Sequence, residues 1–156
     1  MNSRFAIVGA RGVLKFSYGH RGGGGDLVPA LTLEMLRVVT GSSAILIRSD
    51  QGGVSGVALP GVDMPTDQNA RLWIHFAPHD RARFVSAIDL LRDRTPPDRF
   101  AGRLVLVGTS AVGLLDLKTT PIDPAMPGVE VNAQVLENIL TKTTLWRPNF
   151  SIGAEL

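Results

Sequence analysis

The sequence predicts an α/β or mixed α+β domain, built as one sheet with flanking helices. Segments with apolar residues at helical spacing alternate along the chain with short apolar runs, and glycine or proline separates them. A length of 156 residues, of which 44% are hydrophobic and 19% charged, is typical of one globular domain. A domain of this size buries enough surface to fold without a disulfide or a metal ion.

The N-terminal part is predicted to contain a short strand, a loop and a helix. Residues 14–18 form the strand candidate, and the glycine-rich segment 20–26 is a flexible loop. A helix is predicted over residues 28–40, because apolar residues recur there at every fourth position: Leu31, Met35 and Val39. Gly41 is well placed to end this helix.

The middle of the chain is predicted to form strands. The apolar runs 43–48 and 54–59 are separated by Gly52 and Gly53, which is the pattern of a β-hairpin. Residues 71–76 alternate with the period of two that is typical of a strand, with one face formed by Leu72, Ile74 and Phe76.

Two helices and one strand are predicted in the remaining part. A short amphipathic helix covers residues 84–92, and the unbroken apolar run 104–107 suits a central strand buried on both faces. The last helix is predicted over residues 129–140. Its inward face is formed by Val131, Val135 and Ile139, and its outward face by Glu130, Gln134 and Glu137.

Charge and cysteine content narrow the function. The net charge is only +2, and the arginine-rich stretch 81–103 also carries Asp89, Asp93 and Asp98. A nucleic-acid binder needs a clustered excess of positive charge, so this composition argues against nucleic acid as a partner. The chain has no cysteine, which excludes a thiolate metal site. No apolar run reaches the length of about 18 residues that a membrane-spanning helix needs.

The glycine-rich turn 108–113 is the most tempting chemical motif, because it follows a predicted buried strand. Backbone amides in such a turn can hold a phosphate, with Thr109 and Ser110 as candidate ligand residues. However, no lysine follows as in a phosphate loop, and Ser110 occupies the place of a glycine in the dinucleotide motif. Val112 also breaks the pattern around a nucleophilic serine. We therefore favour a tight turn and assign no catalytic residue.

Two further groups of polar residues are candidates for binding. His75, His79 and Asp80 contain metal-binding side chains, but Pro78 prevents the two histidines from sharing a helix face. We therefore predict no metal and no cofactor, with Asp80 and His79 capping the next helix. Asp116 lies among leucines, so its carboxylate needs hydrogen-bond donors, either from the loop that follows it or from a ligand.

Several motifs in the second half of the chain together form a recognisable signature. They are the strand and turn Phe100-Ala101-Gly102-Arg103-Leu104-Val105-Leu106-Val107-Gly108-Thr109-Ser110-Ala111, then Gly113-Leu114-Leu115-Asp116, Thr120-Pro121 and Met126-Pro127-Gly128-Val129-Glu130-Val131. With these motifs, residues 27–148 resemble a known family, the CHASE type 2 domain, a sensory extracellular domain associated with cyclases and histidine kinases. Weaker agreement is found at Leu27-Val28-Pro29-Ala30-Leu31, Pro65-Thr66-Asp67 and Leu72-Trp73-Ile74-His75-Phe76.

The resemblance implies an extracytoplasmic input domain of a bacterial transmembrane receptor, an adenylate or guanylate cyclase or a histidine kinase. Its stimulus would be a small molecule or a protein, and no ligand-binding residue carries over from the family. It also implies that residues 1–26 are an incomplete N-terminal part, that residues 27–148 are the sensor and that residues 149–156 are a juxtamembrane tail. We therefore expect an N-terminally truncated fragment that is soluble by itself and attaches to the periplasmic face of the membrane through adjacent spans.

Two other functions remain as alternatives. One is a small nucleotide-binding or hydrolytic α/β enzyme that uses the turn 108–113. The other is a structural or dimerisation domain, and a homodimer is also compatible with the sensor. Membrane spans and an output domain in the same reading frame would favour the sensor over both alternatives.

Overall fold

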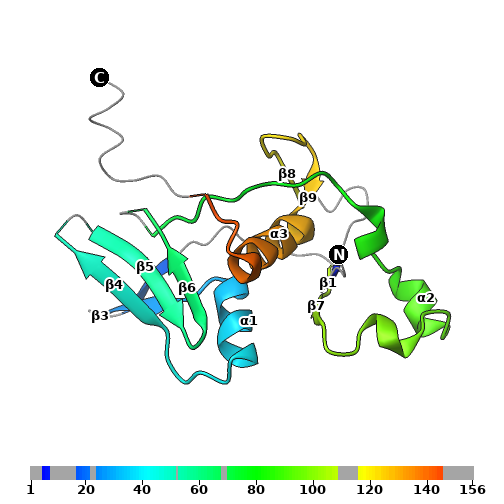
Figure 1. Cartoon of the computed structure of the whole chain (residues 1–156), viewed down its shortest axis with the longest axis horizontal. Helices are drawn as coiled ribbons and strands as arrows, with labels where there is room; N and C mark the ends of the chain where they lie inside the picture. The colour runs from blue at the N-terminus through cyan, green and yellow to red at the C-terminus, as the bar shows by residue number, and fades with distance from the viewer. Residues whose placement is uncertain are drawn as a thin grey trace. The chain divides into compact units, whose positions relative to one another are not determined.

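The computed structural model describes residues 5–7, 17–21, 24–51, 53–67, 70–108 and 116–145, with side chains from residue 29 onward. In chain order, its helices, strands and short 3₁₀ helices (η) are β1 (Phe5–Ile7), β2 (Ser17–Arg21), β3 (Gly24–Val28), α1 (Leu31–Val39), β4 (Leu46–Asp50), β5 (Gly53–Leu59), β6 (Val62–Pro65), η1 (Arg81–Arg83), α2 (Ala87–Leu91), η2 (Pro97–Arg99), β7 (Leu104–Leu106), β8 (Leu117–Lys118), β9 (Met126–Pro127) and α3 (Gly128–Thr141) (Figure 1). The chain divides into two compact units, one of residues 1–11 and 76–134 and the other of residues 12–75 and 135–156.

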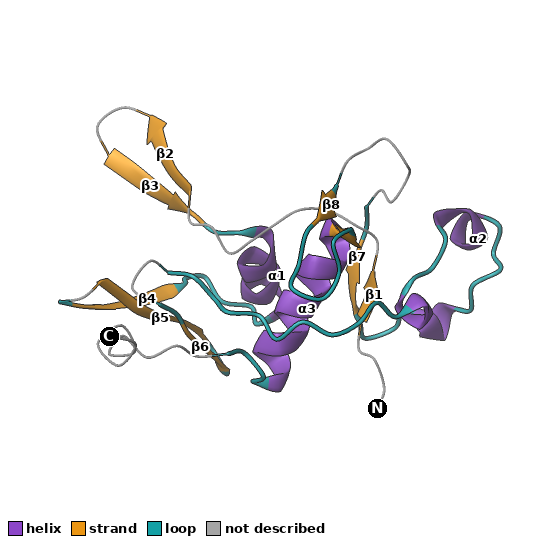
Figure 2. Ribbon diagram, turned by 90° about the horizontal axis from the view of Figure 1, so that it is seen from above, coloured by secondary structure: helices purple, strands orange, loops and turns teal. Residues whose placement is uncertain are grey.

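The predicted mixture of helices and strands is confirmed, but the arrangement of strands differs from the single sheet that was expected. The strands of the described segments form four small sheets: β1 with β7, β2 with β3, β4 with β5 and β6, and β8 with β9 (Figure 2). Among the strands of the described residues, only the β1–β7 pair is parallel. The other three sheets join segments close in sequence, so each can form through a local turn.

The hairpin of β2 and β3 changes the interpretation of the glycine-rich segment. Gly24 and Gly25, predicted as loop, pair in β3 with Arg21 and His20 of β2. The predicted strand 14–18 overlaps β2 at its last two residues, and residues 14–16 lie outside the described segments. Glycine permits a strand as well as a loop, so the glycine content alone predicted this segment wrongly.

Helix α1 confirms the predicted helix, but the four-residue stripe is not its buried side, since Leu31 and Val39 are exposed. It buries Thr32, Leu33 and Leu36. Gly41 ends it with a φ of +66°. The Gly41 backbone N–H donates to the Val38 carbonyl at 3.1 Å, and the Ser42 N–H donates to the Arg37 carbonyl at 3.0 Å. This is the Schellman arrangement, which places a glycine immediately after the last helical turn.

Strands β4, β5 and β6 form an antiparallel meander, which confirms the predicted hairpin of the first two strands. The Arg48 side chain of β4 crosses β5 and forms an ion pair with Asp63 of β6. It passes directly over Gly56, where a Cβ atom would lie 2.7 Å from the Arg48 Nη2 atom. A larger residue at position 56 would displace the end of the Arg48 side chain and would also lie 3.0 Å from the Met64 carbonyl oxygen, so glycine avoids both contacts.

Helix α3 is buried around most of its circumference. The predicted inward residues Val131, Val135 and Ile139 are all buried, as are Val129, Ala133 and Leu136. The prediction that Glu130 and Gln134 face outward is wrong, since only 1% of Glu130 and 2% of Gln134 is exposed. A helix whose polar residues are also enclosed must supply them with hydrogen-bond partners.

The predicted strand 71–76 is wrong as well. Its alternating pattern is not used in a sheet, and within the described segments its only β-type contact is the bridge between Trp73 and Leu145. The backbone that follows Trp73 is bound by side chains of α3 instead. The backbone N–H and carbonyl groups of His75 and Ala77 are therefore satisfied without a neighbouring strand.

Helix α2 is shorter than predicted, and strand β7 is less buried than predicted. Helix α2 covers Ala87–Leu91 instead of residues 84–92. Strand β7 forms where expected, but burial on both faces is wrong, because Val107 immediately after it is 77% exposed. Leu106 is 4% exposed, so this one residue makes most of the contribution of segment 104–107 to the core.

Replacement of Leu106 with alanine is expected to lower the free energy of unfolding by about 2 kcal/mol. This is the low end for buried leucine, because the neighbouring residues of the strand leave room for relaxation. Urea unfolding followed by circular dichroism measures the change, with Val107→Ala as a control expected to shift the free energy by less than about 0.5 kcal/mol. Equal effects of the two substitutions would contradict the one-sided burial of β7.

Candidate functional site

A cavity of about 320 Å³ lies where the segments around α1 and β4 meet, within the unit that contains both elements. Its polar lining comes from Glu34 and Arg37 of α1 and from Ser43. Its apolar lining comes from Pro29 before α1, from Ala44 and Ile45 just before β4, and from Ile47 within β4. The cavity therefore combines a charged wall with an aliphatic wall, which is the usual composition of a small-molecule site.

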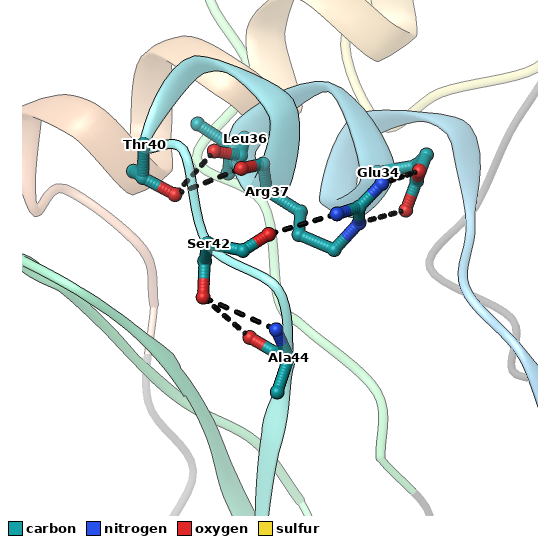
Figure 3. A network of polar contacts seen from close by, with 6 residues as sticks. All are labelled: Glu34, Leu36, Arg37, Thr40, Ser42 and Ala44. Atoms are coloured by element: carbon teal, nitrogen blue, oxygen red, sulfur yellow. Dashed lines mark hydrogen bonds and ion pairs between the residues drawn. The ribbon is translucent and has the colours of Figure 1, made fainter.

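The charged wall is a bidentate ion pair on one helix face. Glu34 and Arg37 are three residues apart, so their side chains lie on the same side of α1. Arg37 Nε donates to Glu34 Oε2 at 2.8 Å, and Arg37 Nη2 donates to Glu34 Oε1 at 2.5 Å (Figure 3). The hydrogen bonds from Arg37 lower the pKa of Glu34, and the same contact raises the pKa of Arg37. Both groups therefore stay charged at neutral pH.

Further hydrogen bonds fix this pair to the end of the helix. Arg37 Nη1 donates to the Ser42 carbonyl at 2.8 Å, across the turn that contains Gly41. The Thr40 hydroxyl donates to the Leu36 carbonyl at 2.9 Å, and the Ser42 hydroxyl donates to the Ala44 carbonyl at 2.7 Å (Figure 3). The guanidinium is thus held by the helix on one side and by the turn toward β4 on the other.

Acid is expected to weaken this part of the fold through Glu34. The pKa of Glu34 is lower in the folded chain, so its contribution to stability is present above the ordinary glutamate pKa and is lost as the pH falls through the folded value. Urea unfolding midpoints measured at about pH 6 and about pH 3 should therefore fall more in the parent chain than in Glu34→Gln. Equal pH dependence in the two chains would show that the pair contributes nothing.

A second group of polar residues lies on the enclosed face of α3. Within one unit, the side-chain amide of Gln134 binds Ala77, accepting from its backbone N–H at 2.8 Å and donating to its carbonyl at 2.9 Å. Within the other unit, Asn138 binds His75 in the same way, at 2.7 Å and 3.2 Å. These two amides replace the neighbouring strand that the extended backbone lacks.

Glu130 lies one helical turn before Gln134, and it too is a buried side chain of α3 that binds the segment before η1. Its Oε2 atom lies 2.6 Å from His79 Nδ1, and the carboxylate side chain is 2% exposed while the imidazole is 38% exposed. The His79 ring also contacts Phe84, with ring centroids 5.0 Å apart and an angle of 43° between the planes. A buried carboxylate is therefore linked to solvent through one half-exposed histidine.

His75, His79 and Asp80, the candidate metal ligands of the sequence, have different partners in the structure. The Asp80 carboxylate accepts a hydrogen bond from the Ala82 N–H at 2.9 Å and so caps η1. The prediction that it caps the helix at residues 84–92 is wrong, because that helix begins after Ser86. His79 faces Glu130, whereas the His75 residue is exposed and is held through its backbone. Among the residues that the structure describes, no group of three or more potential metal ligands is found.

Asp116 precedes β8 in the sequence and contacts the first residue of α3, Gly128. Its backbone carbonyl accepts from the Gly128 N–H at 2.7 Å, and its carboxylate forms an ion pair with Lys118 at 3.3 Å. A Cβ atom at position 128 would lie 2.6 Å from this carboxylate, so Gly128 is required there. The other two candidate ligand residues, Thr109 and Ser110, lie outside the described segments.

The sequence contained a signal for the polar face of α3 but not for the cavity. Glu130, Gln134 and Asn138 recur at every fourth position, and such a row marks a continuous helix stripe. We interpreted part of that stripe as a solvated face. The cavity arises only when the end of α1 meets β4, so no local pattern in the sequence marks it.

Comparison with known proteins supplies the remaining evidence. A family model, the CHASE2 domain, matches residues 8–155. Searches of curated proteins and of solved structures found no match. In the part of the chain that the structure describes, no helix has the length and apolar character needed to cross a membrane.

Proposed function

Since the chain belongs to the CHASE2 family of extracellular sensory domains, we propose that it is the extracytoplasmic input domain of a transmembrane receptor with a cyclase or histidine kinase as its output. The family match over residues 8–155 is the observation that carries this proposal. The family is sensory and non-catalytic, which agrees with the incomplete catalytic motifs of the sequence. The stimulus acts on this domain, and the chemical output is produced elsewhere in the receptor.

The proposed mechanism is a shift between two conformations that the stimulus binds with different affinity. Helix α3 is the element suited to carry such a shift, because residues 128–134 belong to one compact unit and residues 135–141 to the other. Its hydrogen bonds to residues 75–79 are directional, so a displaced helix must exchange them for others. A stimulus that changes these contacts would therefore select one of two discrete positions of the helix.

The location of the domain can be tested by chemical labelling. The chain has no cysteine, so Arg92→Cys at an exposed position introduces a single thiol. We expect a membrane-impermeant maleimide to label this variant in intact cells that express the full-length receptor with its other cysteines replaced. The cysteine-free parent is the control for specificity, and lysed cells are the control for reactivity. Labelling only after lysis, or a reading frame without membrane spans, would overturn the proposal.

A further inference from the structure

We propose that the cavity between α1 and β4 binds a small zwitterion with an aliphatic side chain, of the class of the apolar α-amino acids. This inference rests on the proposed sensory function and names the stimulus that the cavity would accept. Three properties of the lining carry it: its paired charges, its remaining hydrogen-bonding capacity and its aliphatic wall.

The paired charges select against ligands with a single charge. An anion that approaches Arg37 also meets the Glu34 carboxylate, whose oxygens lie 2.5 Å and 2.8 Å from the guanidinium nitrogens. A cation that approaches Glu34 meets the guanidinium in the same way. A molecule with an ammonium and a carboxylate on one carbon can place each charge beside its opposite. The pair therefore favours a ligand that is dipolar and has no net charge.

Both partners of the pair retain hydrogen-bonding capacity. A guanidinium has five N–H donors, and the contacts of Arg37 with Glu34 and Ser42 use three of them. Each oxygen of the Glu34 carboxylate accepts one of these bonds and has a second lone pair. The Arg37 side chain is 30% exposed and that of Glu34 is 40% exposed, so a ligand can reach both without breaking the pair.

The aliphatic wall and the size of the cavity define the rest of the ligand. Pro29, Ala44, Ile45 and Ile47 provide a surface for a branched hydrocarbon side chain. A volume of about 320 Å³ is at the small end of known ligand sites and accommodates leucine, isoleucine or valine. The side chain would remove exposed apolar surface of Ile47 from water, which favours binding.

Calorimetric titration of the full chain with L-leucine and its analogues tests the charge argument. Leucinamide keeps only the positive charge, N-acetylleucine keeps only the negative charge, and glycine is a zwitterion without a side chain. We expect leucine to bind at least about tenfold more tightly than each of the three, because each loses one of the proposed contacts. Equal affinity for leucine and either singly charged analogue, or no binding of leucine, isoleucine or valine, would overturn the proposal.

Substitutions in the lining locate the site. Ala44→Trp should fill the cavity and weaken leucine binding at least about tenfold, whereas Leu46→Trp, on a residue of β4 outside the lining, should leave it unchanged. Ile47→Asn is a second variant that removes the aliphatic wall without added bulk. Equal losses in Leu46→Trp and Ala44→Trp would place binding elsewhere. External labelling at position 92 without leucine binding would reject this ligand class and leave the sensory function intact.

Discussion

Replacement of Gln134 with leucine is expected to lower the free energy of unfolding by about 3 kcal/mol. Gln134 is enclosed in the protein and satisfies both the N–H and the carbonyl of Ala77, at 2.8 Å and 2.9 Å. Leucine fills a similar volume but binds neither group. Each buried backbone group left without a partner costs about 1–3 kcal/mol, and Ala77 is itself half-buried, so water replaces the amide only in part.

Urea unfolding of Gln134→Leu and of the parent chain measures this effect. Gln51→Leu is the matched control, since the same chemical change is made at an exposed turn residue and should shift the free energy by less than about 0.5 kcal/mol. If Gln134→Leu shifts it by less than about 1 kcal/mol, the amide of Gln134 does not hold the backbone at Ala77, and α3 would be free to slide along that segment. That outcome would also remove the physical basis of the two-position mechanism.

The elements that the sequence predicted correctly are those decided by local patterns. The existence of helix α1 follows from the four-residue period of Leu31, Met35 and Val39 and from the glycine that ends it, although its buried residues are Thr32, Leu33 and Leu36. The β4–β5 hairpin follows from two short apolar runs around a glycine turn. Periodicity and turn chemistry act within a few residues, so they are visible without knowledge of the tertiary structure.

The predictions that failed concern contacts between distant segments. The alternation of residues 71–76 predicted a strand, but the partners of this segment are amides from a helix about sixty positions later, as in the pairing of His75 with Asn138. Glu130 and Gln134 face inward because they contact the same segment, Glu130 at His79 and Gln134 at Ala77. Hydrophobic periodicity identifies the apolar stripe of a helix, and it assigns every polar stripe to solvent unless a buried partner is known.

The charged wall and the apolar wall of the candidate cavity also differ in how far the sequence predicts them. The ion pair of Glu34 and Arg37 is a local helix contact, and its three-residue spacing is visible in the sequence. The cavity beside it also needs Ile45 and Ile47, and their position depends on how the chain turns after Gly41. A sequence pattern therefore supplies the charged wall of such a site, whereas only the folded chain supplies the apolar wall.

The pair of Glu130 and His79 is expected to respond unequally to the removal of each partner. His79→Ala should lower the free energy of unfolding by about 3 kcal/mol, because it leaves an enclosed carboxylate without its imidazole. This is the low end for a broken buried pair, since the histidine is 38% exposed and water can enter its place. Glu130→Leu should change the free energy by less than about 1 kcal/mol, because the imidazole that remains can bind water and the new side chain packs in the core.

Urea unfolding near pH 7 of both single variants and of the double variant separates these effects. His75→Ala is the matched control, because this exposed histidine on the same segment is held through its backbone, and its removal should shift the free energy by less than about 0.5 kcal/mol. In the double variant, Glu130→Leu should restore most of the stability lost in His79→Ala, since no carboxylate then remains to be compensated. Equal losses in the two single variants, or additive losses in the double variant, would contradict this account, because the loss in His79→Ala would then not come from an uncompensated Glu130 carboxylate.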